Sequence, residues 1–337
     1  MDFDRRGVLI ALGFAAMSGC ARAETPKYLM PMLDPALWTS YKGRFVLSEG
    51  RVVDTGNGGI SHSEGQGYGL LMAVAAGDRM AFDNMLAWTT MVLRRADVPL
   101  HSWRYEPGKG VTDPNNATDG DLCIAWALLN AGRKWRDDRY LKQAEDMRIA
   151  MANRLIVDRQ DMRLLLPGLF GFEKPDHVLM NLSYYVWPAL DAFAQIDRSV
   201  WKPVIDDGLK MLGKARYGPL KLPADWLDIR GKGDVEPAEG REPLFGFEGI
   251  RVPLYLAMSG RRAQAAPIAR YWSGLIRAHQ PIPATINIVT GETAPYPLSP
   301  GAQAVAARVT GLAIPGSGPI GDYYSSTLGT LNSIVLK

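Results

Sequence analysis

Cysteine is almost absent from this sequence, which has only Cys20 and Cys123 among its 337 residues. A disulfide needs two cysteines in the mature chain, and Cys20 lies in an N-terminal segment that looks like an export signal. We therefore expect no intramolecular disulfide, although an exported protein meets oxidising conditions. The fold must then depend on side-chain packing.

Histidine is also scarce, and the few histidines show no metal-ligand spacing. Metal sites usually draw on histidines or cysteines a few residues apart. The four histidines here are scattered along the chain, at His62, His101, His177 and His279. The sequence predicts no metal site and no cofactor.

Neither sign of charge is in excess. The chain has 38 Lys and Arg against 35 Asp and Glu, and no long run of one sign occurs. Nucleic-acid binding depends largely on basic side chains that neutralise phosphates. The composition therefore argues against a nucleic-acid partner and favours an uncharged or weakly charged one.

The apolar stretch 8–17 is too short for a comfortable membrane span, which needs roughly 20 residues. It follows Arg5 and Arg6 and precedes small residues. This is the pattern of an export signal, and the paired arginines point to the twin-arginine route.

The end of the signal has two interpretations. Ala21-Arg22-Ala23 fits a cleavage site, whereas the residues before Cys20 also resemble a lipoprotein box with Cys20 as the lipidated residue. We favour cleavage after Ala23. The sequence then predicts a signal peptide at 1–23, a single domain at 24–337, and a periplasmic or secreted protein.

Strand patterns are scarce, and helical patterns dominate. Apolar residues recur at three-and-four spacing in about eleven segments. Most of these pair across short turns, and the pairs begin near 64, 118, 183, 248 and 300. Such regular hairpins predict a closed ring of inner and outer helices; the alternative is an open solenoid, whose repeats are usually shorter, about 20 to 45 residues. The segments are 33–45, 64–76, 79–95, 118–133, 139–157, 183–196, 199–214, 250–259, 261–276, 300–312 and 322–336.

The links between the helix pairs are long and rich in Gly, Pro, Trp and Asp. Examples are HSWRYEPGKGVTDPNNATDGD and KLPADWLDIRGKGDVEPAEGREPLFGFEG. Long loops in a compact domain are uncommon unless they have a function. Because each link enters the first helix of a pair, all of them are expected on one face of the ring, which is the candidate site.

Two acidic residues occupy equivalent positions at the N-termini of two predicted helices. Ser63-Glu64-Gly65-Gln66 and Thr118-Asp119-Gly120-Asp121 both have the form of a capping box. Acids favour helix N-termini through the helix dipole, by about 0.3–1 kcal/mol, and this alone would explain an isolated box. Two acids on one face, however, are also placed to converge on a substrate.

The glycines after Glu64 weaken the helix that contains them. Gly65, Gly67 and Gly69 each cost up to about 1 kcal/mol relative to alanine, so a ligand or a second helix must need the space. They also form a GxGxG pattern. No strand precedes it, and the dinucleotide-binding motif requires one, so we reject that interpretation.

Aromatic residues crowd the links and helix starts. Sugar rings present apolar faces, and glycoside hydrolysis depends on paired carboxylates, so acids and aromatics in the same loops indicate a sugar-chain site. Any single aromatic is more often part of the core. The candidates are Trp103, Tyr105, Tyr184, Tyr185, Trp187, Trp226 and Phe247, and among these Trp103 and Trp226 are expected to bind substrate.

Four motifs together resemble glycoside hydrolase family 8, specifically the endoglucanases encoded with bacterial cellulose synthase. They are SEGQGYGLLMAV, NNATDGDLCIAWALL, NLSYYVWPAL and FEGIRVPLYLAM, in this order. The resemblance spans about residues 28–335. It implies an all-α (α/α)6 barrel and hydrolysis of β-1,4-glucan with inversion at the anomeric carbon. We expect a monomer that binds a β-1,4-glucan chain, with the cellulose synthase export machinery as a further partner.

The resemblance also assigns roles to residues. The family's general acid falls on Glu64, and the aspartate that holds the sugar at the cleavage point falls on Asp119. The tyrosine of the third motif falls on Tyr184, with Tyr185 as the alternative.

The fourth motif departs from the family pattern. Where most relatives have Tyr-Asp-Ala, this chain has Phe-Glu-Gly, so the general base falls on Glu248, one methylene longer than the usual aspartate. The motif's arginine matches Arg251, which, like the tyrosine of the third motif, is expected to bind substrate. Pro253 predicts that the helix begins near Val252, with Glu248 in the turn before it, where Gly249 eases an adjustment.

Two alternative functions stay open from the sequence. Other members of the family act on chitosan, xylan or mixed-linkage glucan with the same scaffold. The substitution at Glu248 also allows a glucan-binding protein that has lost catalysis.

Overall fold

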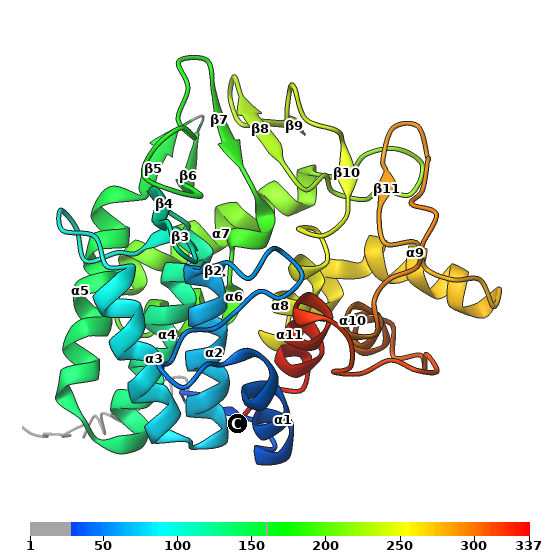
Figure 1. Ribbon diagram of the computed structural model, residues 1–337. Coiled ribbons are helices and arrows are strands. Elements are labelled where there is room, and N and C mark those ends of the chain that lie inside the picture. Colours follow the sequence, from blue (N-terminus) through cyan, green and yellow to red (C-terminus); the bar gives the residue numbers. More distant parts are fainter. Residues whose placement is uncertain (1–27, 160) are drawn as a thin grey trace, which may run out of the picture.

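The computed structural model describes residues 28–159 and 161–337 (Figure 1). The predictions for 1–23 and Cys20 lie outside these residues. Within them, each predicted helical segment overlaps one of eleven α-helices. The helices are α1 (Pro35–Phe45), α2 (Ser63–Ala76), α3 (Arg79–Val92), α4 (Thr118–Trp135), α5 (Asp138–Arg154), α6 (Trp187–Ala194), α7 (Arg198–Lys214), α8 (Arg251–Met258), α9 (Ala266–Arg277), α10 (Pro300–Thr310) and α11 (Tyr323–Asn332).

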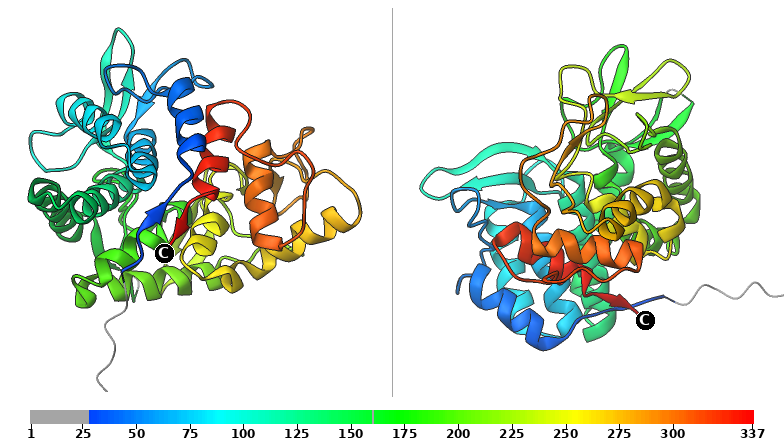
Figure 2. Two further views of the ribbon diagram at one scale, coloured as in Figure 1. Left: turned by 90° about the horizontal axis from the view of Figure 1, so that it is seen from below. Right: turned by 90° about the vertical axis from the view of Figure 1, so that its right-hand side faces the viewer.

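The helices form a closed ring. Helices α2, α4, α6, α8 and α11 are buried almost all around, whereas the other six bury mainly one face. Seen from below, they follow one another in sequence order, and α11 returns to lie beside α1 (Figure 2, left). The antiparallel pair of β1 (Pro31–Met32) and β12 (Val335–Leu336) closes the ring. This is the predicted (α/α)6 barrel, and the open solenoid is excluded because the two ends meet.

Strands are more frequent than the sequence suggested. The described residues contain twelve short strands in five small antiparallel sheets, most of them in the links between helix pairs. The links are polar and rich in turn residues, so apolar and polar residues alternate too weakly in them to predict strands. Their strands are β2 (Ser61–His62), β3 (Ser102–Glu106), β4 (Gly110–Asn116), β5 (Ile156–Arg159), β6 (Met162–Leu165), β7 (His177–Met180), β8 (Leu227–Arg230), β9 (Asp234–Pro237), β10 (Leu244–Phe245) and β11 (Ile286–Asn287).

Helices α2 and α4 pack with their backbones in close approach. A Cβ atom on Gly67 would lie 2.7 Å from Cys123 Cβ, and one on Gly120 would lie 2.6 Å from the backbone nitrogen of Glu64. No side chain fits at either position. The glycines therefore admit a second helix, one of the two predicted reasons for them, and the helix starts that carry Glu64 and Asp119 are brought together.

The predicted capping boxes are wrong. The N-cap of α2 is His62, whose Nδ1 accepts a hydrogen bond from the Gly65 backbone N–H at 3.0 Å. The Gln66 side chain bonds to groups of neighbouring segments instead of reaching back to the helix start. At α4 the N-cap is Ala117, and the Thr118 hydroxyl donates to a distant carbonyl. These polar side chains find tertiary partners that a local pattern does not reveal.

Candidate active site

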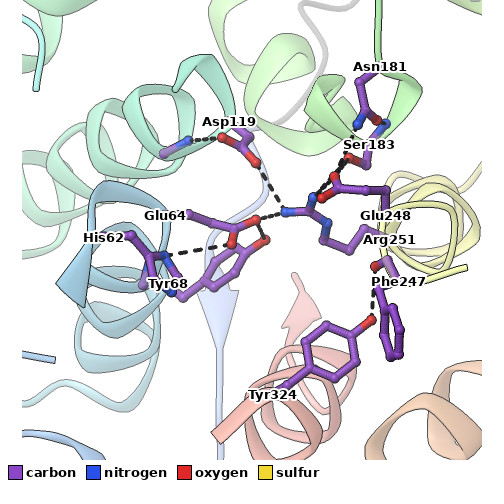
Figure 3. Close-up of polar contacts among 12 residues, drawn as sticks. His62, Glu64, Tyr68, Asp119, Asn181, Ser183, Phe247, Glu248, Arg251 and Tyr324 are labelled. Carbon is purple, nitrogen blue, oxygen red and sulfur yellow. Dashed lines mark hydrogen bonds and ion pairs between the residues drawn. The ribbon is translucent and has the colours of Figure 1, made fainter. Parts of the chain in front are cut away.

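Side chains from four separate segments meet at the N-terminal ends of buried helices (Figure 3). Glu64 and Asp119 are the second residues of α2 and α4, so their positions are equivalent, as predicted. Ser183 lies in a short 3-10 helix just before α6. Glu248 lies in the turn before α8, also as predicted, and Arg251 is the first residue of that helix.

Arg251 is buried and is shared by three carboxylates. Its Nη1 pairs with Glu64 and, at 3.0 Å, with Asp119 Oδ2. Its Nη2 pairs with Glu248 and donates to Ser183 Oγ at 3.0 Å. The three acids singled out in the sequence therefore gather on one guanidinium, which lies between Glu64 and Glu248 in Figure 3.

The Glu64 carboxyl has a different neighbour on each side. Its Oε1 accepts a hydrogen bond at 2.8 Å from the hydroxyl of Tyr68, one helical turn further on. Its Oε2 lies 3.8 Å from His62 Nδ1. Because that nitrogen accepts the Gly65 N–H, the neutral imidazole has its proton on Nε2. The Glu64 side chain is 20% exposed, so a ligand can reach it.

The Glu248 carboxyl is held through one oxygen. Oε2 accepts hydrogen bonds from Asn181 Nδ2 at 3.1 Å and from Ser183 Oγ at 2.9 Å, in addition to the pair with Arg251. No described residue donates a hydrogen bond to Oε1. The side chain is 33% exposed, so Oε1 is available to a water molecule.

The cluster has three carboxyl groups but only one guanidinium. If all three carboxyls were ionised, one guanidinium would leave two negative charges unbalanced in a largely buried site, which is unfavourable. Burial, with the added charge of Glu248, raises the pKa of Asp119 to about 8. Burial also raises the pKa of Glu248. The cluster therefore retains a proton near neutral pH.

Of the two candidate tyrosines, only Tyr184 belongs to the site. Burial and the nearby charges of Asp119 and Glu248 raise the pKa of its hydroxyl. Tyr185 as the alternative is wrong: it is fully buried, and its hydroxyl accepts the Leu165 backbone N–H at 3.1 Å.

Trp226 joins the site through Tyr184. The centroids of these two rings are 6.0 Å apart, and the Phe172 ring lies nearly parallel to Trp226 at 6.2 Å. The Arg241 guanidinium sits 4.2 Å from the centroid of the Trp226 ring. Trp103 is half-buried on β3, the strand that pairs with β2 directly before α2. Neither tryptophan takes part in the hydrogen bonds described for the three carboxylates.

Sequence analysis missed the residues that hold the carboxylates in place. Tyr68 follows Glu64 at the i,i+4 spacing that joins side chains on one helix face, and this signal was available. Asn181 and Ser183 lie in the third motif, but their contact with Glu248 spans more than 60 residues. No local pattern reveals such a contact.

The described residues contain no group of three or more His, Cys, Asp or Glu side chains arranged to hold a metal ion. Cys123, buried in α4, is a free thiol. None of the described helices is long and apolar enough to cross a membrane.

Comparisons with known proteins agree on one family. The model of glycosyl hydrolases family 8 matches residues 1–335. A probable endoglucanase of Novacetimonas hansenii is 38% identical, over 93% of this chain and 95% of that protein. An endoglucanase of Cellulomonas uda is also 38% identical, over 80% of this chain and 75% of its own length.

Solved structures show the same similarity in three dimensions. The endo-β-1,4-glucanase of Acetobacter xylinum superposes with a TM-score of 0.83 at 38% identity, over 88% of this chain and 96% of that one. An endo-β-1,4-glucanase from an Achatina fulica gut metagenomic library also superposes with a TM-score of 0.83, at 39% identity.

Proposed function

Since this chain belongs to glycoside hydrolase family 8, we propose that it is an inverting endo-β-1,4-glucanase that hydrolyses internal bonds of cellulose or soluble β-glucan. The relatives named as endoglucanases, at 38% identity over most of their length, support this substrate class. The observation that carries the proposal is the pair of glutamates, Glu64 and Glu248, on opposite sides of Arg251.

In the proposed reaction Glu64 is the general acid and Glu248 the general base. Glu64 gives its proton to the departing glycosidic oxygen as the bond to the anomeric carbon breaks. Oε1 of Glu248 takes a proton from the water whose oxygen attacks that carbon from the opposite face. The product is the α-anomer. An inverting pair is expected to hold its carboxyls roughly 6.5 to 9.5 Å apart to admit the water.

Arg251 pairs with Glu64 in the structure, and this contact must weaken before Glu64 can act as the acid. Donation requires a protonated Glu64, and a protonated carboxyl no longer attracts a guanidinium strongly. We expect Arg251 to stay with Glu248 when a glucan is bound, because the general base must be ionised to take a proton from the water.

The remaining site residues have binding roles in this proposal. Asp119 holds the sugar at the cleavage point, and Tyr184 lies beside both Asp119 and Glu248. Trp226 and Trp103 offer apolar faces to sugar rings further along the chain. The proposal includes no metal and no cofactor.

Location and partners follow from the N-terminal sequence and the resemblance. We propose that the protein is exported to the periplasm or secreted as a monomer. The resemblance to endoglucanases encoded with cellulose synthase supports a role beside the cellulose export machinery.

Proton NMR of cellopentaose hydrolysis tests the central proposal. We expect the α-anomer signals of the new reducing ends to appear first and the β-anomer signals to grow by mutarotation. Initial β-anomer would mean a retaining mechanism. If cellopentaose gave no product but chitosan, xylan or mixed-linkage oligosaccharides were cut, one of these would be the substrate. If none of them were cut, the result would favour a glucan-binding protein without catalysis.

A further inference from the structure

Asp225 lies behind the turn that carries Glu248 and is not explained by the roles given above. It precedes β8 in the link from α7, and its backbone N–H donates to the carbonyl of Leu244 in β10 at 2.7 Å. β10 leads directly into the turn before α8. Asp225 is therefore fixed against the strand from which the turn begins.

The Asp225 carboxylate holds the two ends of this turn. Its Oδ1 accepts the backbone N–H of Gly246 at 2.9 Å and that of Gly249 at 2.8 Å. Phe247 and Glu248 lie between these two donors. A single oxygen atom thus fixes the backbone on both sides of Glu248.

Both donors are glycines because nothing larger fits beside the carboxylate. A Cβ atom on Gly249 would lie 2.8 Å from Asp225 Oδ1, and one on Gly246 would lie 2.9 Å from a methyl carbon of Thr285. The turn is clamped, so Gly249 serves close packing and not the adjustment expected from the sequence. Among the described residues, Tyr324 is the only other side chain with a hydrogen bond to the backbone of this turn, and its hydroxyl donates to the Phe247 carbonyl at 2.9 Å.

We infer that Asp225 is a positioning residue that sets the reach of Glu248 toward the attacking water. The inference rests on the proposed role of Glu248 as general base. Asn181, Ser183 and Arg251 hold the far end of the Glu248 side chain, and Asp225 holds its backbone. A base longer by one methylene than the usual aspartate needs both ends fixed, since a displacement of about 1 Å at a reacting group costs on the order of a hundredfold in rate.

Asp225→Ala and Asp225→Asn separate positioning from general stability. Asparagine keeps an oxygen that accepts both glycine N–H groups, whereas alanine removes it. With cellopentaose as substrate, we expect Asp225→Ala to lower kcat about 10- to 100-fold with KM within about twofold. Asp225→Asn should restore kcat to within about fivefold of the wild type.

Asp197→Ala is the matched control. Asp197 also accepts a backbone N–H, from Val200 at 3.3 Å at the start of the outer helix α7, away from the site. It should lower the melting temperature and leave kcat unchanged. If Asp225→Ala lowers only the melting temperature, as this control does, Asp225 is structural and the inference is wrong.

If Asp225→Ala folds poorly, double variants with Glu248→Ala provide a second test. They also separate the proposed role of Asp225 from that of Glu248. In a Glu248→Ala background, Asp225→Asn and Asp225→Ser should have equal residual turnover, while with Glu248 present Asp225→Ser should be at least about tenfold slower than Asp225→Asn. Equal rates with Glu248 present would overturn the role of Asp225. Normal turnover by Glu248→Gln would instead overturn the role of Glu248.

Discussion

At the scale of single residues, the site depends on how one arginine is divided among three acids. Arg251 is 7% exposed and contacts Glu64, Asp119 and Glu248 at once. Each acid has a further partner that distinguishes it: Tyr68 for Glu64, the Gly120 N–H for Asp119, and Asn181 with Ser183 for Glu248. The same functional group can therefore act as acid, sugar ligand or base according to its surroundings.

Glu64→Gln tests the general acid. Glutamine keeps the size and the contact with Tyr68 but has no acidic proton, so we expect hydrolysis of carboxymethylcellulose to fall at least about a hundredfold. Helical circular dichroism should be unchanged. Glu49→Gln, at an exposed loop position, is the control and should keep full activity. Retained activity in Glu64→Gln would assign the acid to another residue.

Glu248→Gln and Glu248→Asp test the general base. Glutamine keeps the hydrogen-bonding partners of Oε2 but cannot accept the proton of the water, so turnover should be abolished while glucan binding, measured by calorimetry, stays nearly intact. Aspartate restores the charge with a shorter reach, and measurable activity should remain. Normal turnover by the glutamine variant would make Asp119 the first alternative to test.

Asp119→Asn tests whether the raised pKa of the Asp119 carboxyl lowers the free energy of unfolding as pH rises. Asp119 binds its proton more tightly in the folded chain, with a pKa of about 8, than at its ordinary value of 3.8. Between these pH values the folded state holds more protons than the unfolded state, so stability falls as pH rises, by up to about 1.4 kcal/mol per pH unit. Melting temperatures from pH 5 to 8 should fall less steeply in Asp119→Asn. Parallel curves would show that Asp119 is already ionised at pH 5, and unchanged kinetics would reduce it to a helix-start residue.

At the scale of elements, the contact between α2 and α4 positions Glu64. Gly67→Ala tests it, because the added Cβ would lie 2.7 Å from Cys123 Cβ and 3.0 Å from the Gly120 carbonyl oxygen. Forced separation of the helices should cost about 1–3 kcal/mol and lower kcat as well. Gly43→Ala in α1 is the control: nothing lies within 4 Å of its added Cβ, so it should stabilise the fold slightly. Equal melting temperatures for both variants would contradict the close packing.

The helices could be predicted from the sequence, but their caps and the links could not. Apolar residues at helical spacing identify α2 and α4, which are buried along most of their length. An acidic residue marks the start of each helix. The cap of α2 depends on where the His62 imidazole ring lies in the fold. The Thr118 hydroxyl donates to a carbonyl 48 residues away. In the site, Glu64, Asp119 and Glu248 were found by motif. Asp225 was not, because its two hydrogen bonds join segments more than 20 residues apart.

At the scale of the whole molecule, the closed ring of helices brings the site residues together. Side chains at 64, 119, 183 and 248 meet because the inner helices that follow them are closed into one barrel. We expect activity to be unaffected by EDTA and by a reducing agent, measured on carboxymethylcellulose. Loss of activity on chelation, restored by a divalent ion, would show a metal role that the described side chains do not suggest.

The closing of the ring by α11 has a consequence for synthesis of the protein. Ribosomes make this helix after the other ten described helices, yet the Tyr324 hydroxyl holds the turn that carries Glu248, and the Tyr323 hydroxyl occupies the space beside Gly65, next to Glu64. A nascent chain therefore carries both glutamates long before it has the helix that supports them. Chains that terminate before α11 are therefore expected to be inactive, and only chains that include this helix would cut a glucan.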